Sequence, residues 1–401
     1  MPWVTPRHPT LSRALVVVGI VVLAFNLRPA AVSVGPVLGD VRDGLGMSAT
    51  ETGLLTSLPV LAFAVFGALA PRLARLVGVH RFTLVALLGV VVGLAGRASV
   101  SSVPAFLLLS LLALAGMASA NVLLPSLVKL HFPDRVGLMT SVYSTALAVG
   151  LTGASVATVP VSEAYAGWRS GLLVWSVTAG IAVLPWLALV RQDRAAPEQP
   201  ERPVGLLDVA RTRLGWLMAL FFGLQSLQAY SIFGWFAQVY RDAGFAASTA
   251  GLLLGVITGV SIPLSFLVPS LAARMQDQSL LMVAVMSCYP VGYLGLVLAP
   301  AGGAWVWAVF VGIGTTTFPL ILTLIGLRAR TPEGTAALSG FAQAMGYLVA
   351  AAGPFAVGVL HDVSGGWTVP LLVLLALVVP QLALGLAVSR PAYVEDQLRR
   401  R

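Results

Sequence analysis

The sequence predicts an all-α membrane protein with twelve transmembrane helices in two pseudo-symmetric six-helix halves. Three observations support this fold class. Of 401 residues, 58% are apolar and only 10% are charged, whereas a soluble globular chain has about 25% charged residues. The apolar residues form continuous runs of membrane-spanning length, and they do not alternate as in a bacterial β-barrel. Short motifs also recur between the two halves of the chain.

Six apolar runs fill the first half of the chain, and each is close to the roughly 20 residues that a helix needs to cross a bilayer. Lipid offers no partner to unpaired backbone groups, so runs of this length must be helical. The first follows a short basic tail and is too long for a signal peptide, so we expect an uncleaved first helix. The runs are 15–38, 51–70, 81–99, 103–128, 137–160 and 168–190.

A polar stretch rich in proline follows the sixth run and predicts a cytoplasmic linker. We therefore expect an N-terminal half over 1–190, a linker over 191–213 and a C-terminal half over 214–401. The runs of the second half are 214–237, 248–271, 279–299, 303–327, 335–359 and 367–389.

An internal repeat supports this division. A Gly-Leu-Leu triplet at 53–55 recurs 198 residues later at 251–253, and Gly-Trp at 167–168 recurs 199 residues later at 366–367. Two similar halves joined by a cytoplasmic linker predict a secondary transporter, with the substrate site near the midplane of their interface.

The positive charges are distributed unevenly between the two sides of the predicted membrane. Of the 24 Lys and Arg residues, 19 fall inside, four outside and one within the bilayer when the N-terminus is placed inside. This bias predicts both termini in the cytoplasm of a bacterial inner membrane. It also explains the net charge of +9 without nucleic acid as a partner. The four outside residues are Arg42, Arg97, Arg169 and Arg241.

No enzyme signature is present. The sequence has no P-loop, H-E-x-x-H or G-x-S-x-G motif, and its single cysteine, Cys288, lies in an apolar run. We therefore expect no enzymatic activity, cofactor or metal, and a monomer whose partners are the lipid bilayer and a small-molecule substrate. A non-transporting sensor or receptor is an alternative, although the longest loop is short for a ligand or output domain.

Arg28 is the sharpest candidate for a binding residue. It lies about 5 Å from the centre of the first run, at 1.5 Å per residue, where arginine costs at least about 2.5–3.5 kcal/mol. No other charged residue lies mid-helix, so its expected partner is the substrate. Alternatively, Arg28 bonds helix carbonyls or snorkels outward. Pro29 frees a carbonyl near residue 25, which predicts a bent first helix.

Polar and aromatic residues in other runs are candidates for the same cavity. Gln225 and Gln228 share a helix face, as do Gln343 and Tyr347. The alternative for each is hydrogen bonding between helices. The substrate-binding candidates are Asn26, Arg28, Asn121, Tyr143, Gln225, Gln228, Tyr230, Trp235, Gln343 and Tyr347.

No titratable acid lies at depth, so coupling uses a group near a helix end or the transporter is not strictly proton-coupled. Glycines spaced four apart at 89 and 93, and at 251, 255 and 259, predict close helix packing. The coupling or gating candidates are Glu51, His361, Asp362, Arg72 and Arg75.

Several stretches resemble the cyanate permease-like (CynX/NimT) family of the major facilitator superfamily. Residues 26–29 (Asn-Leu-Arg-Pro) resemble the first-helix signature, and 120–133 resemble the fourth helix. Gln225-Ser226 with Tyr230 and Trp235 is similar to the seventh helix. The eleventh helix and the following turn are similar over residues 343–367. In all, the resemblance spreads over about residues 20–370.

This resemblance implies the major facilitator fold and an inner-membrane transporter of small anionic or polar solutes, such as cyanate, by alternating access. It alternatively implies export of nitroimidazole-type or other drug-like compounds. One departure concerns the superfamily motif after the second helix. Pro71 stands at its acidic position and Ala74 at its glycine, so the gating salt-bridge network of that loop is doubtful here.

Overall fold

The computed structural model describes residues 10–165, 167–191 and 204–399, and these contain helices and no strand. Twelve segments among them are long and apolar enough to cross a membrane. The prediction of an all-α protein with twelve transmembrane helices is therefore confirmed. Most of the predicted linker, residues 192–203, lies outside the described residues.

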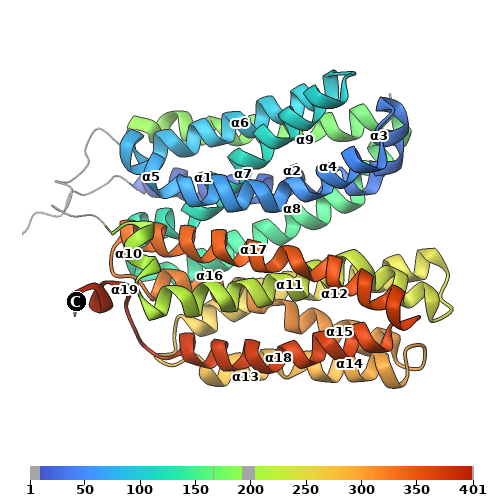
Figure 1. Ribbon diagram of the computed structural model, residues 1–401. Coiled ribbons are helices and arrows are strands. Elements are labelled where there is room, and N and C mark those ends of the chain that lie inside the picture. The colour runs from blue at the N-terminus through green and yellow to red at the C-terminus, as the bar shows by residue number, and fades with distance from the viewer. Residues whose placement is uncertain (1–9, 166, 192–203, 400–401) are drawn as a thin grey trace, which may run out of the picture.

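The helices before this gap pack into one bundle, which we call the N-terminal half (Figure 1). The elements are α1 (Thr10–Leu27), α2 (Pro29–Val32), η1 (Gly35–Val37), α3 (Leu38–Leu45), α4 (Ala49–Ala62), η2 (Phe63–Gly67), α5 (Ala68–Val77), α6 (Val79–Ser99), α7 (Val103–His131), η3 (Pro133–Arg135), α8 (Val136–Ala164) and α9 (Trp168–Leu189).

The helices after the gap form a second bundle beside the first, the C-terminal half (Figure 1). The elements are α10 (Leu206–Ala210), α11 (Arg213–Asp242), α12 (Ala247–Ala272), α13 (Ser279–Met286), α14 (Cys288–Leu298), α15 (Ala304–Thr315), α16 (Thr317–Leu327), α17 (Pro332–Ser364), α18 (Thr368–Ser389) and α19 (Val394–Arg399). The short helices α10 and α19 lie together at one end of the molecule.

We call that end the basic end, because Arg75, Lys129, Arg213 and Arg330 lie there. The second apolar run extends further toward it than the sequence indicated. We expected Arg72 and Arg75 in a loop, but both lie on α5, which continues to Val77. The helix persists because Ala70, Pro71 and Ala74 stay buried along one face while Arg72 is exposed on the other.

Close contacts between the halves gather toward the basic end. A Cβ added to Gly340 of α17 would lie 2.7 Å from the Pro71 ring, and one added to Gly137 of α8 would overlap Ala273. Four side-chain hydrogen bonds join the halves among the described residues, and all lie toward this end. They are Asn121 Nδ2 to Gln343 Oε1 (2.7 Å), Ser126 Oγ to the Pro332 carbonyl (2.8 Å), Lys129 Nζ to the Gly326 carbonyl (3.4 Å) and Ser141 Oγ with Ser270 Oγ (2.9 Å).

The opposite end of the interface is not packed in this way. Gly251, Gly255 and Gly259 have no atom within 4 Å of an added Cβ, so the prediction of close packing along this stripe is wrong for this structure. The other predicted stripe is tightly packed at Gly93, where an added Cβ would lie 2.5 Å from the Ala113 nitrogen. Among the described residues, the close glycine contacts and the side-chain hydrogen bonds between the halves thus lie toward the basic end.

Gly150 allows α8 to approach the end of α1. An added Cβ would lie 2.0 Å from the Phe25 carbonyl oxygen, which is the acceptor that Pro29 leaves without its helical donor. Overpacking costs about 1–3 kcal/mol, so Gly150→Ala is expected to lower the melting temperature of the purified protein.

The matched control is Gly180→Ala on α9, where an added Cβ has no atom within 4 Å. Alanine is favoured there by roughly 0.5–1 kcal/mol through helix propensity, so its melting temperature should hold or rise. Equal melting temperatures for the two variants would contradict the close approach of α8 to α1.

Candidate functional site

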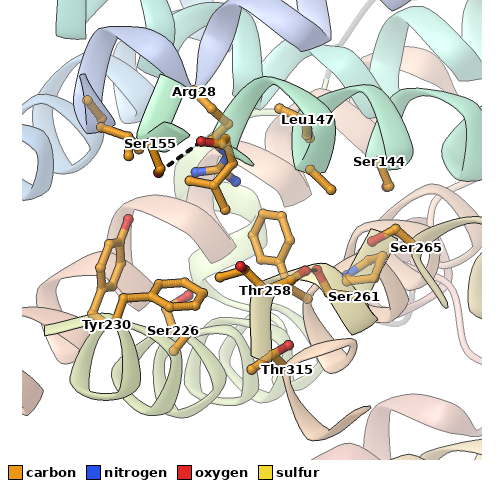
Figure 2. Close-up of a pocket in the computed structure, with 18 of the residues that line it drawn as sticks. Arg28, Ser144, Leu147, Ser155, Ser226, Tyr230, Thr258, Ser261, Ser265 and Thr315 are labelled. Atoms are coloured by element: carbon orange, nitrogen blue, oxygen red, sulfur yellow. Dashed lines mark hydrogen bonds between the residues drawn. The ribbon is translucent and has the colours of Figure 1, made fainter. Parts of the chain in front are cut away.

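A cavity of about 370 Å³ lies between the two halves. Its upper wall in Figure 2 comes from the N-terminal half and its lower wall from the C-terminal half. Among the described residues that line it, Arg28 is the only one charged at neutral pH. The polar lining is otherwise made of hydroxyls and one amide, from Ser144, Ser155, Gln225, Ser226, Tyr230, Thr258, Ser261, Ser265, Thr315 and Tyr347.

Arg28 enters the cavity because the first transmembrane helix breaks at this residue. Helix α1 ends at Leu27 and α2 begins at Pro29. The Arg28 carbonyl accepts from the backbone N–H groups of Ala31 and Val32, at 3.1 Å each. The helix assignment is therefore interrupted at Arg28, although its backbone angles stay helical (φ −84°, ψ −38°), and its side chain points between the halves (Figure 2).

The Arg28 guanidinium lies against aromatic groups of the C-terminal half. Its Cζ atom is 5.0 Å from the centroid of the Phe318 ring, a distance at which a cation attracts an aromatic face. The hydroxyls of Tyr230 and Tyr347 lie within electrostatic reach of the same charge. No described carboxylate forms an ion pair with Arg28, so the cation has neutral neighbours only.

A contact between Phe63 and Tyr347 closes the cavity toward the basic end. Their ring centroids are 4.1 Å apart, one ring from each half. Phe63 begins η2, a single π-helical stretch between α4 and α5. Such stretches occur often at functional sites. Here the stretch places the Phe63 ring against Tyr347, whose hydroxyl lies beside Arg28.

Arg97 holds the segment that follows Arg28. Its Nη1 donates to the Ala30 carbonyl at 3.0 Å and its Nη2 to Ser33 Oγ at 2.8 Å. The Ser33 hydroxyl donates in turn to the Pro29 carbonyl at 2.6 Å. The charge count assigned Arg97 to the outside, but the structure buries it within α6 with 1% of its surface exposed. Its place two residues before the end of an apolar run was the only signal in the sequence.

Of the ten candidates for substrate binding, four line the cavity. Arg28, Gln225, Tyr230 and Tyr347 are brought together from three helical segments of both halves. The Gln225 amide oxygen accepts from Ser226 Oγ at 3.1 Å, so both residues present polar groups to the same wall.

Other candidates make hydrogen bonds between helices, which was the alternative for each. Asn26 donates to the Val22 carbonyl and accepts from Thr178 Oγ1 at 2.7 Å. It lies on a lateral groove between α1, α8 and α9 and not on the central cavity. Asn121 and Gln343 bond each other across the interface, nearer the basic end.

Three further candidates lie within the bundles. Gln228 donates to the Leu374 carbonyl at 2.9 Å and accepts from the Tyr293 hydroxyl at 2.6 Å, both inside the C-terminal half. Trp235 donates to the carbonyl of Pro354 at 2.8 Å. Tyr143 is fully buried in α8, and its hydroxyl has no partner among the described residues.

Glu51 caps a helix, which limits its value as a proton carrier. Its Oε2 accepts from the Ser48 backbone N–H and hydroxyl at 2.8 Å each, just outside the span that begins at Leu58. These hydrogen bonds lower the pKa of the Glu51 carboxyl from its usual value. The carboxylate therefore stays ionised at neutral pH.

The remaining coupling and gating candidates also have local roles. His361 Nδ1 lies 3.2 Å from an oxygen of Asp362, on the exposed end of α17. Arg75 Nη1 donates to the Val204 carbonyl at 2.8 Å, which ties α5 to the described part of the predicted linker. Arg72 is exposed on α5.

The sequence analysis missed part of the cavity wall. Phe318 escaped notice because an aromatic residue in an apolar run carries no signal of its own. The hydroxyls of Thr258, Ser261 and Ser265 were detectable, because a spacing of three and seven residues places them on one helix face. They form the polar face of α12 toward the cavity (Figure 2).

The chain is similar in sequence to known transporters. A model of the Major Facilitator Superfamily matches residues 15–354. The chain is 35% identical over 364 residues to the 2-nitroimidazole transporter of Escherichia coli (strain K12), covering 90% of this chain and 92% of that protein. It is 28% identical over 351 residues to the cyanate transport protein CynX of the same strain, covering 87% and 90%.

The fold matches that of a solved transporter. The fucose:proton symporter FucP of E. coli superimposes with a TM-score of 0.74 at 14% identity, covering 95% of this chain and 99% of that one. The expectation of a transporter rather than an enzyme is confirmed by the family match. A family model that spans most of the chain, together with these relatives, shows that the protein belongs to the Major Facilitator Superfamily of secondary transporters, in its CynX/NimT-like branch.

Proposed function

We propose that the protein moves a small anionic or polar solute across the bacterial inner membrane by alternating access, with Arg28 as the charged binding residue. One observation carries the proposal: Arg28 is the only charged residue among those described around the cavity between the halves. A guanidinium presents five donors in a planar fork that suits the oxygens of an anion. The hydroxyls of Tyr230 and Tyr347 add hydrogen-bonding groups beside it.

A cation without a counter-ion in a largely apolar cavity favours an anion as ligand. Burying a charge without a partner is costly, and a bound anion removes that cost. The relative CynX is a cyanate transport protein, which agrees with this chemistry. Cyanate-like anions are therefore our first substrate class.

The size and aromatic lining of the cavity favour a second candidate, a planar nitroimidazole-type compound that is exported. A volume of about 370 Å³ exceeds what a triatomic anion fills. It lies within the roughly 300–1,000 Å³ of sites for larger ligands. Phe318 and Phe233 offer flat apolar surfaces to a ring, while Arg28 can donate to nitro oxygens. The other relative is a 2-nitroimidazole transporter.

We further propose that the basic end faces the cytoplasm and that the protein works as a monomer. The excess of Lys and Arg at this end follows the positive-inside rule. With this orientation the structure is closed toward the cytoplasm, and solutes reach Arg28 from outside.

The site assignment is tested by Arg28→Gln in the purified protein. We expect the substrate to raise the melting temperature of the wild type, because a ligand that binds only the folded state stabilises it. The panel is cyanate, nitrate, formate, benzoate and neutral 2-nitroimidazole. Loss of a charge-assisted hydrogen bond costs about 1.5–3 kcal/mol, so Arg28→Gln should bind anions at least roughly tenfold more weakly.

Arg169→Gln is the matched control. Arg169 also stacks on an aromatic ring, with Cζ 4.5 Å from the Trp168 centroid, but it bonds the carbonyls of Ala98 and Val100, away from the cavity. It should bind every ligand like the wild type. Stabilisation by 2-nitroimidazole alone, unchanged in Arg28→Gln, would favour the exporter and make Arg28 structural.

Arg97 is expected to act as a positioning residue for Arg28. It touches no cavity space but bonds the turn between Pro29 and Ser33. If it acts only through Arg28, Arg97→Gln should weaken anion binding in the wild type and add nothing in the Arg28→Gln background. Anion titrations of the wild type, the two single variants and the double variant measure the coupling free energy between Arg97 and Arg28. Additive losses would show that Arg97 supports the fold in general.

A further inference from the structure

The charge of the cavity depends on whether it is occupied. Arg28 gives the empty cavity one positive charge, and a bound monovalent anion reduces it to zero. We propose that the protein is an obligatory anion exchanger, in which the empty carrier does not cross between its two states at a useful rate. This inference rests on the proposed function, namely that an anion binds at Arg28.

No other group on the cavity wall can neutralise Arg28. Serine, threonine, tyrosine and glutamine side chains stay uncharged at neutral pH, and the described lining holds no Asp, Glu, His or Lys. Hydroxyls can hydrogen-bond the guanidinium, but they cannot take up its charge. A cavity with its own carboxylate would be neutral when empty, and this one is not.

The carboxylates toward the open end of the molecule are held elsewhere. Glu51 accepts a hydrogen bond from the Ser48 backbone N–H, and Asp242 accepts one from Trp367 Nε1 at 2.7 Å. Asp43 pairs with Arg42 and Asp362 with His361. Asp40 and Glu163 lie exposed on helices α3 and α8 and do not line the cavity. None of these carboxylates lines the cavity, so none is placed to pair with Arg28 when the cavity closes.

For the empty carrier, the free-energy barrier is highest when both ends of the cavity are closed around Arg28. In the present structure the cavity is shut toward the cytoplasm by the contact of Phe63 with Tyr347. Closing the outer end as well removes bulk water from Arg28 and leaves it beside Phe318, Tyr230 and Tyr347, none of which carries a negative charge. Sequestering an unpaired cation in this way is strongly unfavourable, whereas the ion pair with a bound anion is not.

Exchange follows from this difference. The loaded carrier crosses in either direction as a neutral complex, so one anion enters for each anion that leaves. For monovalent anions the cycle moves no net charge. It therefore needs neither a membrane potential nor a proton, which agrees with the lack of a carboxylate or histidine in the described lining.

The first test measures flux in proteoliposomes. Vesicles contain either unlabelled anion or only an impermeant sulfonate buffer, and uptake of the labelled anion is followed for cyanate, formate and benzoate in turn. We expect internal anion to raise the initial rate by at least about tenfold, the factor that corresponds to 1.36 kcal/mol of barrier. Equal rates in both kinds of vesicle, or uptake driven by a proton gradient alone, would overturn the proposal.

The second test needs no substrate. A donor dye and an acceptor dye are placed at Glu163 and Ala301, which are exposed on opposite halves at the outer end, in a Cys288→Ser background, and the distance between them is followed over time in single molecules. Without ligand, the parent protein should change only rarely between the long and the short distance, because the empty carrier must sequester the Arg28 charge to cross. Arg28→Gln removes the charge and should change between the two distances at least about tenfold more often, whereas Arg169→Gln should not.

The two tests separate the possible failures. If no anion is taken up under either loading, the proposed anion transport fails. The single-molecule distances then still report whether the Arg28 charge slows the crossing of the empty carrier. If anions are taken up but Arg28→Gln changes between the two distances as rarely as the parent, the proposed function stands and obligatory exchange is wrong.

Discussion

The arrangement of the interface depends on one unpaired cation at a break in the first transmembrane helix. Pro29 removes the backbone donor that would bond the Phe25 carbonyl, and α1 ends at Leu27, just before Arg28. Around it, the protein supplies an aromatic ring and hydroxyls but no acid among the residues that line the cavity. Two further residues contact the backbone on either side of this break. Gly150 lets α8 reach the Phe25 carbonyl, and Arg97 bonds the turn beyond Pro29.

Two neighbouring arginines differ in burial, because Arg97 is buried whereas Arg28 is half-buried at the cavity. Arg97 is 1% exposed, and its Nη1 and Nη2 donate to the Ala30 carbonyl and to Ser33 Oγ, while its Nε has no partner among the described residues. Arg28 points into the cavity between the halves, beside Phe318 and the hydroxyls of Tyr230 and Tyr347. The same residue type thus braces the backbone in one position and is the proposed binding group in the other, and the neighbouring acceptors differ accordingly.

The fold was predictable from the sequence because bilayer thickness and backbone hydrogen bonding leave few choices for long apolar runs. Arg28 was predictable for the same reason, since a mid-helix charge is conspicuous. The sequence did not show which glutamine side chains line the cavity. Gln225 lines the cavity while Gln228, one turn away, bonds Leu374 and Tyr293. Helical spacing gives the face that residues share, but it does not give what that face meets. Phe318 could not be predicted as a site residue for a related reason, because only its position against Arg28 in the structure distinguishes it from other phenylalanines.

The closure of the basic end has a consequence for the ionic conditions in which the protein works. Pro71 replaces the acidic residue expected there and packs against Gly340. Three of the four hydrogen bonds between the halves have neutral amide or hydroxyl donors, and the fourth has the Lys129 ammonium, which also interacts with the Glu395 carboxylate of the C-terminal half. Dissolved salt screens charges but scarcely affects neutral hydrogen bonds and van der Waals contacts. The neutral contacts of this closure therefore depend little on ionic strength, whereas the interaction between Lys129 and Glu395 weakens as salt rises.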